Sequence, residues 1–341
     1  MSHQITVQPC GATYTAEADE TLLDAALRQG ITIPYGCKNG ACSACKASVL
    51  AGEVDPGPYQ PHALNEQEIA AGKVLLCCAH AKSDLTIENR QAVLKAEIPV
   101  KLMPVRVEAM EKRAPDVITL NLRLPASETF TFRAGQFIDV LLADGQRRSY
   151  SIANAPEQAG VLELHIRRVP GGRFTGQVFE QMKVKDILRF EGPHGGFYLR
   201  DDSKKPVILL ASGTGFAPVK AMVEHAIAQN SDRPLHIYWG CRKEIDLYLS
   251  ALPTAWAAEH AHIRYTPVLS EPESGWRGRT GFVHQAVVAD YPDLSRHEVY
   301  ACGAPAMIDA ARQDFANACK LPEEAFFSDA FTFAPQGKTS S

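Results

Sequence analysis

Three cysteines within nine residues constrain this chain more than any other feature. They lie in residues 34–45 (PYGCKNGACSAC) at C-x4-C-x2-C spacing, and residues 76–79 (LCCA) offer a fourth thiol. Thiolates gathered in one place concentrate negative charge, which inward-facing backbone N–H groups must offset. Gly36, Gly40 and Ala41 carry almost no side chain, so the loop can curl tightly. The alternative, a set of incidental buried cysteines, is disfavoured by the glycine spacing and the fourth thiol.

This spacing resembles the [2Fe–2S] site of plant-type ferredoxins, and the resemblance covers about residues 1–95. It implies a β-grasp domain and four metal ligands, which are Cys37, Cys42, Cys45 and Cys77. Cys77 and Cys78 compete for the fourth place. The offset to residues 79–84 (AHAKSD) favours Cys77 and leaves Cys78 as a small buried hydrophobe. We also expect the Ser43 hydroxyl to bond a cluster sulfur.

Length and composition limit the number of domains, the kinds of partner and the location that we expect. A chain of 341 residues is long enough for two or three domains, and 45% hydrophobic with 22% charged residues is ordinary for a globular protein. A net charge of −4 gives no reason to expect a nucleic-acid or membrane partner. There is no run of about 18 apolar residues and no signal sequence. Nine cysteines without a secreted framework fit a reducing compartment, so we expect a cytoplasmic protein.

A second pattern begins after residues 96–103, where Pro99 and the Pro104 that follows suggest an interdomain linker. Short β-rich segments follow with turns between them, which predicts a small antiparallel barrel. The segments are 104–110, 117–124, 135–142, 147–152 and 161–167. Residues 147–152 (RRSYSI) contain Arg-x-Tyr-Ser, a weak signal alone. A glycine turn at 171–175 followed by a helix at 176–183 strengthens it, because such a turn presents free N–H groups to a phosphate.

Together these features resemble the flavin barrel of the ferredoxin–NAD(P)H reductase superfamily. The resemblance implies that Arg148 binds the flavin pyrophosphate, that Tyr150 packs on the flavin ring, and that Ser151 points at the reactive flavin nitrogen. Further flavin contacts are implied for Ser149, His165, Ile166, Arg167, Gly171, Gly172, Arg173, Phe174 and Thr175. The domain order of the family implies that the flavin is FAD.

From residue 204 the pattern changes to alternating strands and helices, which predicts a parallel sheet. An apolar strand at 205–211 runs into residues 212–218 (SGTGFAP) and a helix through about residue 229. A glycine turn between strand and helix predicts a pyrophosphate site. Pro218 stands where a dinucleotide fingerprint would have its third glycine, which argues against a standard Rossmann dehydrogenase.

This turn, with residues 300–305 (YACGAP), resembles the nicotinamide domain of the same superfamily. Cofactor contacts are implied for Gly213, Thr214, Gly215, Phe216, Pro218, Cys302, Gly303, Pro305 and Phe331. Cys302 would sit beside the nicotinamide, although a buried strand-end thiol is the alternative. Residues 326–331 (FFSDAF) resemble the tail that covers the flavin, so Asp329 and Phe331 would lie near hydride transfer. Ser151, Cys302 and Asp329 are the predicted catalytic residues.

We therefore expect an α+β multidomain chain. Its predicted parts are a [2Fe–2S] ferredoxin domain at 1–95, a linker at 96–103, an FAD-binding β-barrel at 104–203, an NAD(P)-binding α/β domain at 204–335 and a tail at 336–341. Arg242 and Lys243 would favour NADPH, whereas Glu244 and Asp246 oppose a 2′-phosphate, and NADH is the preferred expectation.

The implied function is an NAD(P)H-dependent oxidoreductase that passes electrons through FAD and [2Fe–2S] to a partner enzyme. The ending at 326–331 most resembles the CDP-6-deoxy-3,4-glucoseen reductases, whose partner is a dehydratase. The alternative is the reductase component of a multicomponent mono- or dioxygenase. A non-enzymatic iron–sulfur carrier or redox sensor is a further alternative, which the intact glycine turns and Arg148 disfavour.

Overall fold

The computed structural model describes residues 2–61, 63–94 and 98–331, which divide into two compact units. The first unit consists of Met1–Ile98, Gly195–Phe197 and Phe327–Ala330. The second consists of Pro99–His194, Tyr198–Phe326 and Phe331–Ser341. The predicted tail at 336–341, and residues 95–97 at the predicted first domain boundary, lie outside the described residues.

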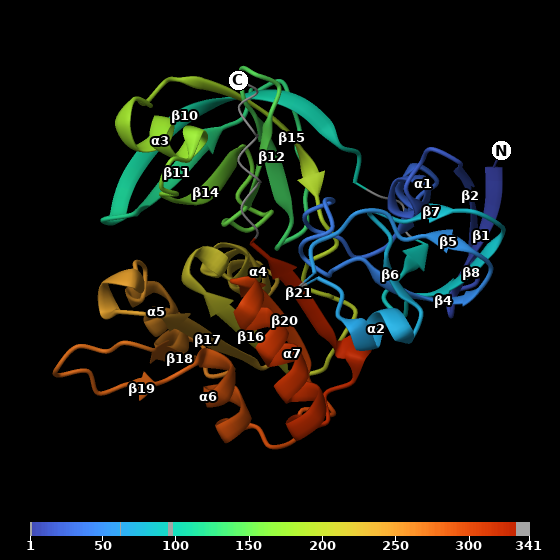
Figure 1. Ribbon diagram of the computed structural model, residues 1–341. Helices are drawn as coiled ribbons and strands as arrows, with labels where there is room; N and C mark the ends of the chain where they lie inside the picture. Colours follow the sequence, from blue (N-terminus) through green and yellow to red (C-terminus); the bar gives the residue numbers. More distant parts are fainter. Residues whose placement is uncertain (1, 62, 95–97, 332–341) are drawn as a thin grey trace. The chain divides into compact units, whose positions relative to one another are not determined.

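The first unit is a β-grasp domain built on a mixed five-stranded sheet in the order β2-β1-β8-β4-β6 (Figure 1). β1 pairs with β8 in parallel, and the other neighbours are antiparallel. Helix α1 buries Leu22, Leu23 and Ala26, the apolar stripe expected of an amphipathic helix. Its elements are β1 (Ser2–Gln8), β2 (Ala12–Glu17), α1 (Leu22–Arg28), β3 (Ile31–Thr32), β4 (Lys46–Ala51), β5 (Val54–Asp55), α2 (Glu66–Ala70), β6 (Lys73–Leu75), β7 (His80–Ala81), β8 (Leu85–Glu88) and β9 (Val93–Leu94).

The second unit begins with the predicted antiparallel barrel, in the order β13-β12-β15-β10-β11-β14. A bridge between Ile152 and Leu164 joins the two outer strands and closes it. Alternate residues such as Leu120, Leu122 and Phe190 are fully buried in its core, as a strand with one inward face requires. Its elements are β10 (Lys101–Ala114), β11 (Val117–Arg123), β12 (Phe137–Leu141), β13 (Arg147–Ser151), β14 (Val161–Arg167), α3 (Arg173–Glu180) and β15 (Ile187–His194).

Two boundaries in the barrel differ from the sequence-based expectations. Strand β10 begins at Lys101, inside the segment 96–103 that we interpreted as a linker. Pro104 does not interrupt β10, because β10 still pairs with β15 on one side and β11 on the other. Helix α3 begins at Arg173 and not at residue 176, so the end of the predicted glycine turn forms the first helical turn.

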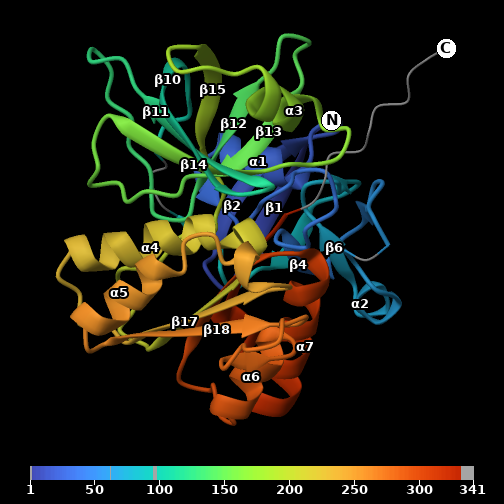
Figure 2. The same ribbon diagram turned by 90° about the vertical axis from the view of Figure 1, so that its left-hand side faces the viewer.

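The nicotinamide half of the second unit is a sheet in the order β19-β18-β17-β16-β20-β21, and the pairings through β20 are parallel. Figure 2 shows α4 between this sheet and the barrel, with α6 and α7 on the sheet's other side. Its elements are β16 (Val207–Ser212), η1 (Gly213–Gly215), α4 (Phe216–Ala228), β17 (Leu235–Cys241), η2 (Glu244–Asp246), α5 (Ala251–Glu259), β18 (Ile263–Leu269), β19 (Arg279–Thr280), α6 (Val283–Asp290), β20 (Glu298–Gly303), α7 (Pro305–Cys319), η3 (Glu323–Ala325) and β21 (Phe326–Ala330).

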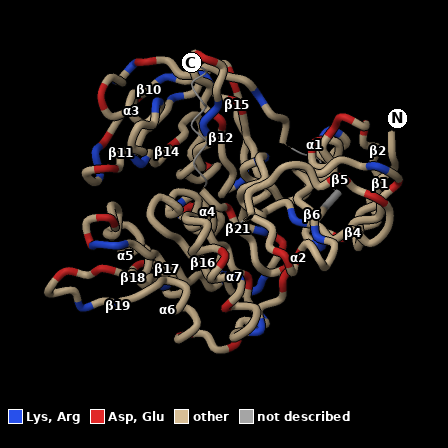
Figure 3. Tube along the Cα trace, in the orientation of Figure 1, with Lys and Arg blue, Asp and Glu red and all other residues tan. Residues whose placement is uncertain are grey.

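Acidic and basic residues are interspersed along the described parts of both units (Figure 3). Among the described residues, no helix has the length and apolarity needed to cross a membrane.

Candidate functional site

The cysteine loop of the first unit curls around its own thiols. Backbone N–H groups of Asn39 and Ala41 donate to Sγ of Cys37, at 3.5 and 3.3 Å. The N–H of Cys37 donates to Sγ of Cys42 at 3.3 Å. Positive φ angles at three loop positions turn these groups inward. They are Lys38 (54°), Gly40 (72°) and Ser43 (63°). The loop therefore supplies the backbone donors that clustered thiolates require.

The thiols lie in two pairs. Cys37 pairs with Cys42, and the hydrogen bond between their side chains lowers the pKa of Cys37 to about 6. Cys77 pairs with Cys45, and the hydrogen bond between them raises the pKa of Cys77. A [2Fe–2S] cluster takes two thiolates on each of its two irons. The pairing therefore fits such a cluster. Among the described residues no three metal-ligating groups converge on a single ion, and a paired two-iron site does not need that.

Cys78 takes no part in these two pairs. Its Sγ lies 3.7 Å from that of Cys77, and burial raises its pKa to about 12. It packs under the loop, where a Cβ added at Gly40 would lie only 2.8 Å from its sulfur. Cys77 as the fourth ligand stays a prediction. The Ser43 hydroxyl donates to the carbonyl of Ala63 at 2.8 Å, so the bond that we expected from it to a cluster sulfur is not formed.

Asp329 belongs to the same unit as the cysteine loop. Its side chain is 7% exposed, and its Oδ1 would lie 2.9 Å from a Cβ at Gly36, next to Cys37. Burial raises its pKa to about 7, and the negative charge of Cys37 adds to the rise. The structure thus places this predicted catalytic carboxylate beside the cluster loop, and its effect on hydride transfer stays a prediction.

Strand β13 carries the predicted flavin motif of the second unit. Arg148 is half-buried and its guanidinium donates only to nearby acceptors, the Arg147 carbonyl and Oε1 of Gln146. The Tyr150 ring packs 5.4 Å from Phe174, and burial raises its pKa. Ser151 is buried at the strand end. A cation, an aromatic ring and a hydroxyl in one strand are what the implied flavin contacts need. Ser149 instead donates to Oδ1 of Asp139 at 2.6 Å.

The glycine turn before α3 also fits a phosphate. Gly172 is the N-cap of α3, and the helix start has no side-chain cap, so its N–H groups point outward. Thr175 accepts a bond from the N–H of Val169 at 3.2 Å and so fixes the turn. Gly171 has a φ of 72°, which favours glycine. Arg173 is paired with Asp144 on the exposed side.

The side chains of His165 and Arg167 on β14 have close neighbours in the nicotinamide half. Both ring nitrogens of His165 are occupied, at 2.7 Å from the Tyr248 hydroxyl and 2.7 Å from Glu163. The Arg167 guanidinium reaches the nicotinamide turn, where its Nη1 would lie 2.7 Å from a Cβ at Gly213. Its Nη2 is buried with no hydrogen-bond partner in the described chain. Flavin contacts from His165, Ile166 and Arg167 stay predictions.

The two glycine turns of the nicotinamide half are packed back to back. A Cβ at Gly215 would lie 2.1 Å from the Cys302 carbonyl, and one at Gly303 would lie 2.2 Å from the Ser212 hydroxyl. Gly303 also has a φ of 131°. The N–H of Ala304 donates to that hydroxyl at 2.9 Å. Only glycine fits at these two positions, and the result is a cradle of backbone atoms between the ends of β16 and β20.

Aromatic packing and Phe331, which follows β21, complete this cradle. Phe216 stacks on Trp239 at 3.9 Å, and the Trp239 indole donates to the Gly213 carbonyl at 2.9 Å. Phe331 donates its N–H to the Gly303 carbonyl at 2.8 Å, which brings the predicted flavin-covering end to the second turn. Cys302 is fully buried. Pro305 begins α7 and Pro218 lies in the first turn of α4, where proline is tolerated.

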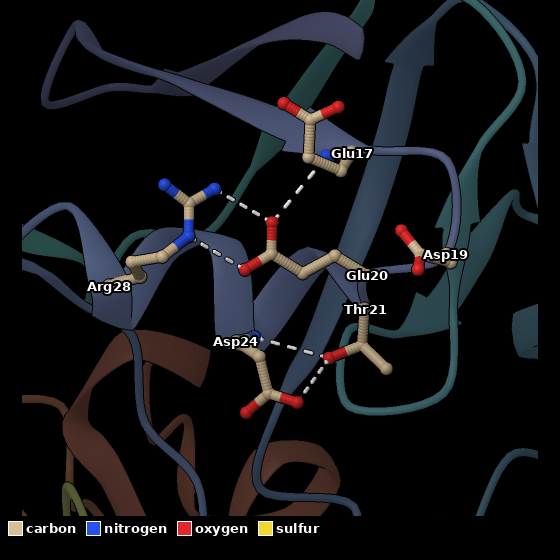
Figure 4. Close-up of a pocket in the computed structure, with 6 residues that line it drawn as sticks. All are labelled: Glu17, Asp19, Glu20, Thr21, Asp24 and Arg28. Carbon is tan, nitrogen blue, oxygen red and sulfur yellow. Dashed lines mark hydrogen bonds and ion pairs between the residues drawn. The ribbon is translucent and has the colours of Figure 1, made fainter. Parts of the chain in front are cut away.

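A hollow on the first unit lies outside all of these motifs (Figure 4). It is lined by Glu17, Asp19, Glu20, Thr21, Asp24 and Arg28. Arg28 binds both carboxylate oxygens of Glu20, at 2.8 and 2.7 Å. Thr21 caps α1 by accepting the Asp24 N–H at 3.1 Å. These contacts explain the acidic cluster as the start of a helix, where negative charge is stabilising.

Comparison with known families agrees with this division of the chain. The model of the 2Fe-2S iron-sulfur cluster binding domain matches residues 5–82. The models of the oxidoreductase FAD-binding domain and NAD-binding domain match residues 104–198 and 209–313. A CDP-6-deoxy-L-threo-D-glycero-4-hexulose-3-dehydrase reductase of Yersinia pestis is 46% identical over 97% of this chain and 99% of its own length. The chain belongs to the ferredoxin–NAD(P)H reductase superfamily.

Other members of the superfamily cover the chain equally well. The reductase component DmpP of a phenol 2-monooxygenase from Pseudomonas sp. is 35% identical over 100% of this chain and 98% of its own. The crystal structure of an Amycolatopsis cytochrome P450 reductase, GcoB, has a TM-score of 0.76 at 33% identity and covers 97% of this chain and 99% of its own. This chain is therefore an electron-transfer oxidoreductase with [2Fe–2S], FAD and NAD domains, and the predicted fold class and cofactors are confirmed.

Sequence reasoning missed the residues that join the flavin barrel to the nicotinamide half. Glu163, Lys220 and Tyr248 carry no motif, and the sequence gives no sign that they meet. The only available signal was a lysine within an otherwise apolar run of helix α4, which is unusual for a buried face.

Proposed function

We propose that this protein is the NADH-dependent reductase component of a deoxysugar pathway, and that it delivers electrons to a dehydratase acting on a CDP-linked hexulose. The observation that carries this proposal is the presence, in one chain, of paired thiols and two nucleotide cradles. The Yersinia relative, named as a reductase for such a dehydrase, supports the choice of partner at 46% identity over 97% of the chain. All nine cysteines are free, which supports a cytoplasmic location.

The residues of the chain would bind and align the cofactors. Bound FAD would supply the exchange between hydride and single-electron chemistry, and the [2Fe–2S] cluster would accept single electrons. Arg148 and the start of α3 would hold the FAD pyrophosphate. Gly213, Gly215 and Gly303 would let the nicotinamide nucleotide approach the backbone closely.

Ser151 and Cys302 would act on alignment and not as nucleophiles. Both are buried, and hydride transfer needs no ionised side chain, so each would fix the distance between two rings. The Ser151 hydroxyl would face the flavin nitrogen, and Cys302 would support the nicotinamide from the end of β20. Loss of either should slow flavin reduction while FAD and cluster remain loaded.

We propose NADH as the donor on the charges at the end of β17. The Lys243 ammonium lies 3.4 Å from Glu273, and Asp246 accepts the backbone N–H of Lys243 at 3.1 Å. Glu273 pairs with the cation that a 2′-phosphate would need, and Asp246 adds a negative charge beside it. A ratio of kcat/KM that favours NADPH would contradict this assignment.

A second candidate is the reductase component of an oxygenase. It is favoured by relatives named for phenol 2-monooxygenase and terephthalate 1,2-dioxygenase, at 35% and 33% identity. The two candidates differ in the partner enzyme that accepts the electrons. The final substrate would bind to that partner, so this chain would not contact it.

The deciding experiment measures delivery to each acceptor. The purified reductase with NADH should support turnover of a CDP-hexulose dehydratase and leave an oxygenase component at its background rate. Turnover of the oxygenase alone would favour the second candidate. Failure to reduce cytochrome c with NADH would contradict any electron-transfer role.

A control variant separates electron delivery by the flavin from electron delivery by the cluster. Cys77→Ser should keep ferricyanide reduction by NADH, because the flavin can serve that acceptor directly, and should lose most cytochrome c reduction. Equal cytochrome c rates in both proteins would mean that the cluster is not the outlet.

A further inference from the structure

A buried lysine joins the nicotinamide half to the flavin barrel. Lys220, on α4, is 6% exposed, and its Nζ lies 3.1 Å from Glu163 on β14 and 2.8 Å from Glu224 one turn along the helix. Nζ also donates to the carbonyl of Ala153 at 3.3 Å. One cation thus contacts two segments of the barrel. We call Lys220, Glu163 and the Ala153 carbonyl the Lys220 clamp.

The clamp continues into a second contact between the same two halves. Glu163 accepts from His165 at 2.7 Å, and His165 reaches the hydroxyl of Tyr248, which lies just before α5. Burial alone would raise the pKa of Glu163, but the His165 bond and the Lys220 charge outweigh it and lower that pKa to about 2. Burial lowers the pKa of His165. The ion pair of this network is the 3.1 Å contact between Lys220 and Glu163.

The position of the clamp along the chain gives it a meaning beyond packing. Helix α4 directly follows the turn Gly213–Gly215, so Lys220 is fixed to the nicotinamide cradle. Ala153 lies two residues after Ser151, and Glu163 is on the strand that ends at Arg167. The clamp thus joins the segments that would carry the two reacting rings.

A purely structural role would not require charge here. A buried ion pair is weak evidence for stability, because apolar residues of similar volume often serve as well. Arg233 and Glu298 form another buried pair, at 2.7 Å, next to the starts of β17 and β20 and away from the ends of the strands that carry the nicotinamide cradle. The pair bonds Arg200 and Ser203 at the end of the predicted FAD-binding segment but none of the predicted flavin-contact residues, so it offers a control.

We propose that Lys220 is a positioning residue for hydride transfer, which holds the nicotinamide cradle at a fixed distance from the Ser151 end of β13. This inference rests on the proposed function. It concerns alignment, so FAD loading, cluster loading and flow from flavin to cluster should not depend on it. A displacement of about 1 Å can cost on the order of 100-fold in rate, which makes alignment measurable.

The test uses full-length holoenzyme with Lys220→Met, which keeps the length of the side chain and removes its charge. Stopped-flow flavin reduction by NADH should slow by about 10- to 100-fold at saturation, while FAD content and dithionite-driven cluster reduction stay normal. Amide hydrogen exchange without NADH should rise in α4 and in the barrel segment around Ala153. Arg233→Met should lower the unfolding temperature but keep the reduction rate within about twofold, because its site touches no alignment element.

The double variant Glu163→Gln with Lys220→Met separates alignment from stability. Removing both charges leaves Glu163 without an uncompensated charge, and Glu224, which loses Lys220, keeps a hydrogen bond from Gln158, so the unfolding temperature should partly recover. The reduction rate should stay low. If Lys220→Met fails to fold, Glu163→Gln alone should show the same slow reduction, because Lys220 then keeps Glu224.

Three results would overturn the proposal. They are a wild-type reduction rate in Lys220→Met, recovery of the rate together with stability in the double variant, or an equal rate loss in Arg233→Met. If NADH does not reduce the wild-type flavin at all, the proposed function fails. Hydrogen exchange then still decides whether the clamp holds the two halves together, since unchanged exchange in α4 and around Ala153 would refute it.

Discussion

The cysteine loop of the first unit and the nucleotide cradle of the second are built in different ways. In the loop, side chains from one short segment carry the function, and a single distant residue, Cys77, completes them. In the cradle, backbone atoms carry it. Gly215 and Gly303 are needed because an added Cβ would lie 2.1 and 2.2 Å from atoms of the neighbouring turns, and Gly303 also has a positive φ.

This difference determines how each region responds to substitutions. A ligand set fails when one sulfur is lost, because no other group replaces it. A cradle fails gradually, because its geometry depends on many packing contacts that can shift a little. The predictions below test that contrast.

The largest effect is expected at the thiol pairs. Cys77→Ser should abolish the visible [2Fe–2S] absorption or make it unstable, because one iron would lose a thiolate. Cys78→Ala should keep the spectrum, since Cys78 only packs under the loop. Iron and sulfide analysis with the visible spectrum measures both. A stable cluster in Cys77→Ser and none in Cys78→Ala would reverse the ligand assignment.

The second effect concerns the one side chain on which the flavin site most depends. Arg148→Ala should weaken FAD binding by about 1.5–3 kcal/mol, the usual range for hydrogen bonds to a charged group. The variant should purify flavin-poor and regain activity with added FAD. Arg147→Ala is the matched control on the same strand, because Arg147 pairs with Glu191. Equal FAD affinity in the Arg148 variant and wild type, measured by fluorescence titration, would refute the role.

The third effect tests the cradle itself. Gly215→Ala should lower the free energy of unfolding by roughly 1–3 kcal/mol and raise the KM for NADH, because the new methyl meets the Cys302 carbonyl. Gly176→Ala in α3 meets open space and should raise stability by about 0.5–1 kcal/mol. Denaturant unfolding and steady-state kinetics give both quantities. Similar effects of the two substitutions would mean that packing against Cys302 does not constrain the turn.

The smallest effect is expected where neither site is involved. Burial lowers the pKa of His236, on β17, to about 4 from its usual 6.5. The unfolded chain then binds more protons between these values, so stability is full above pH 6.5 and falls as pH drops toward 4. His236→Gln should reduce the stability loss between pH 7.5 and 5 by about 1 kcal/mol, allowing for the exposed part of the ring. The same dependence of the unfolding free energy on pH in the variant and the wild type, measured by urea unfolding, would contradict this.

The sequence predicted those parts of the protein that short segments encode. The cysteine spacing, the glycine turn at 213–215 and the strand–helix alternation after residue 204 are local signals, and the structure confirms the three-part fold that they indicated. Helix α7 (Pro305–Cys319) begins at a proline, a residue that favours the first helical position and is visible in the sequence. The preference for Cys77 also came from local spacing.

Only the tertiary structure decided how distant segments meet. In the structure the Ser43 hydroxyl donates to the Ala63 carbonyl, Asp329 lies beside the cluster loop, and the Arg167 guanidinium lies next to Gly213. The Lys220 clamp joins residues 57 positions apart, and no periodicity encodes such a contact. A motif fixes the chemistry available within a few residues, whereas a buried charge finds its partner only when packing removes water and the nearest acceptor lies on another element.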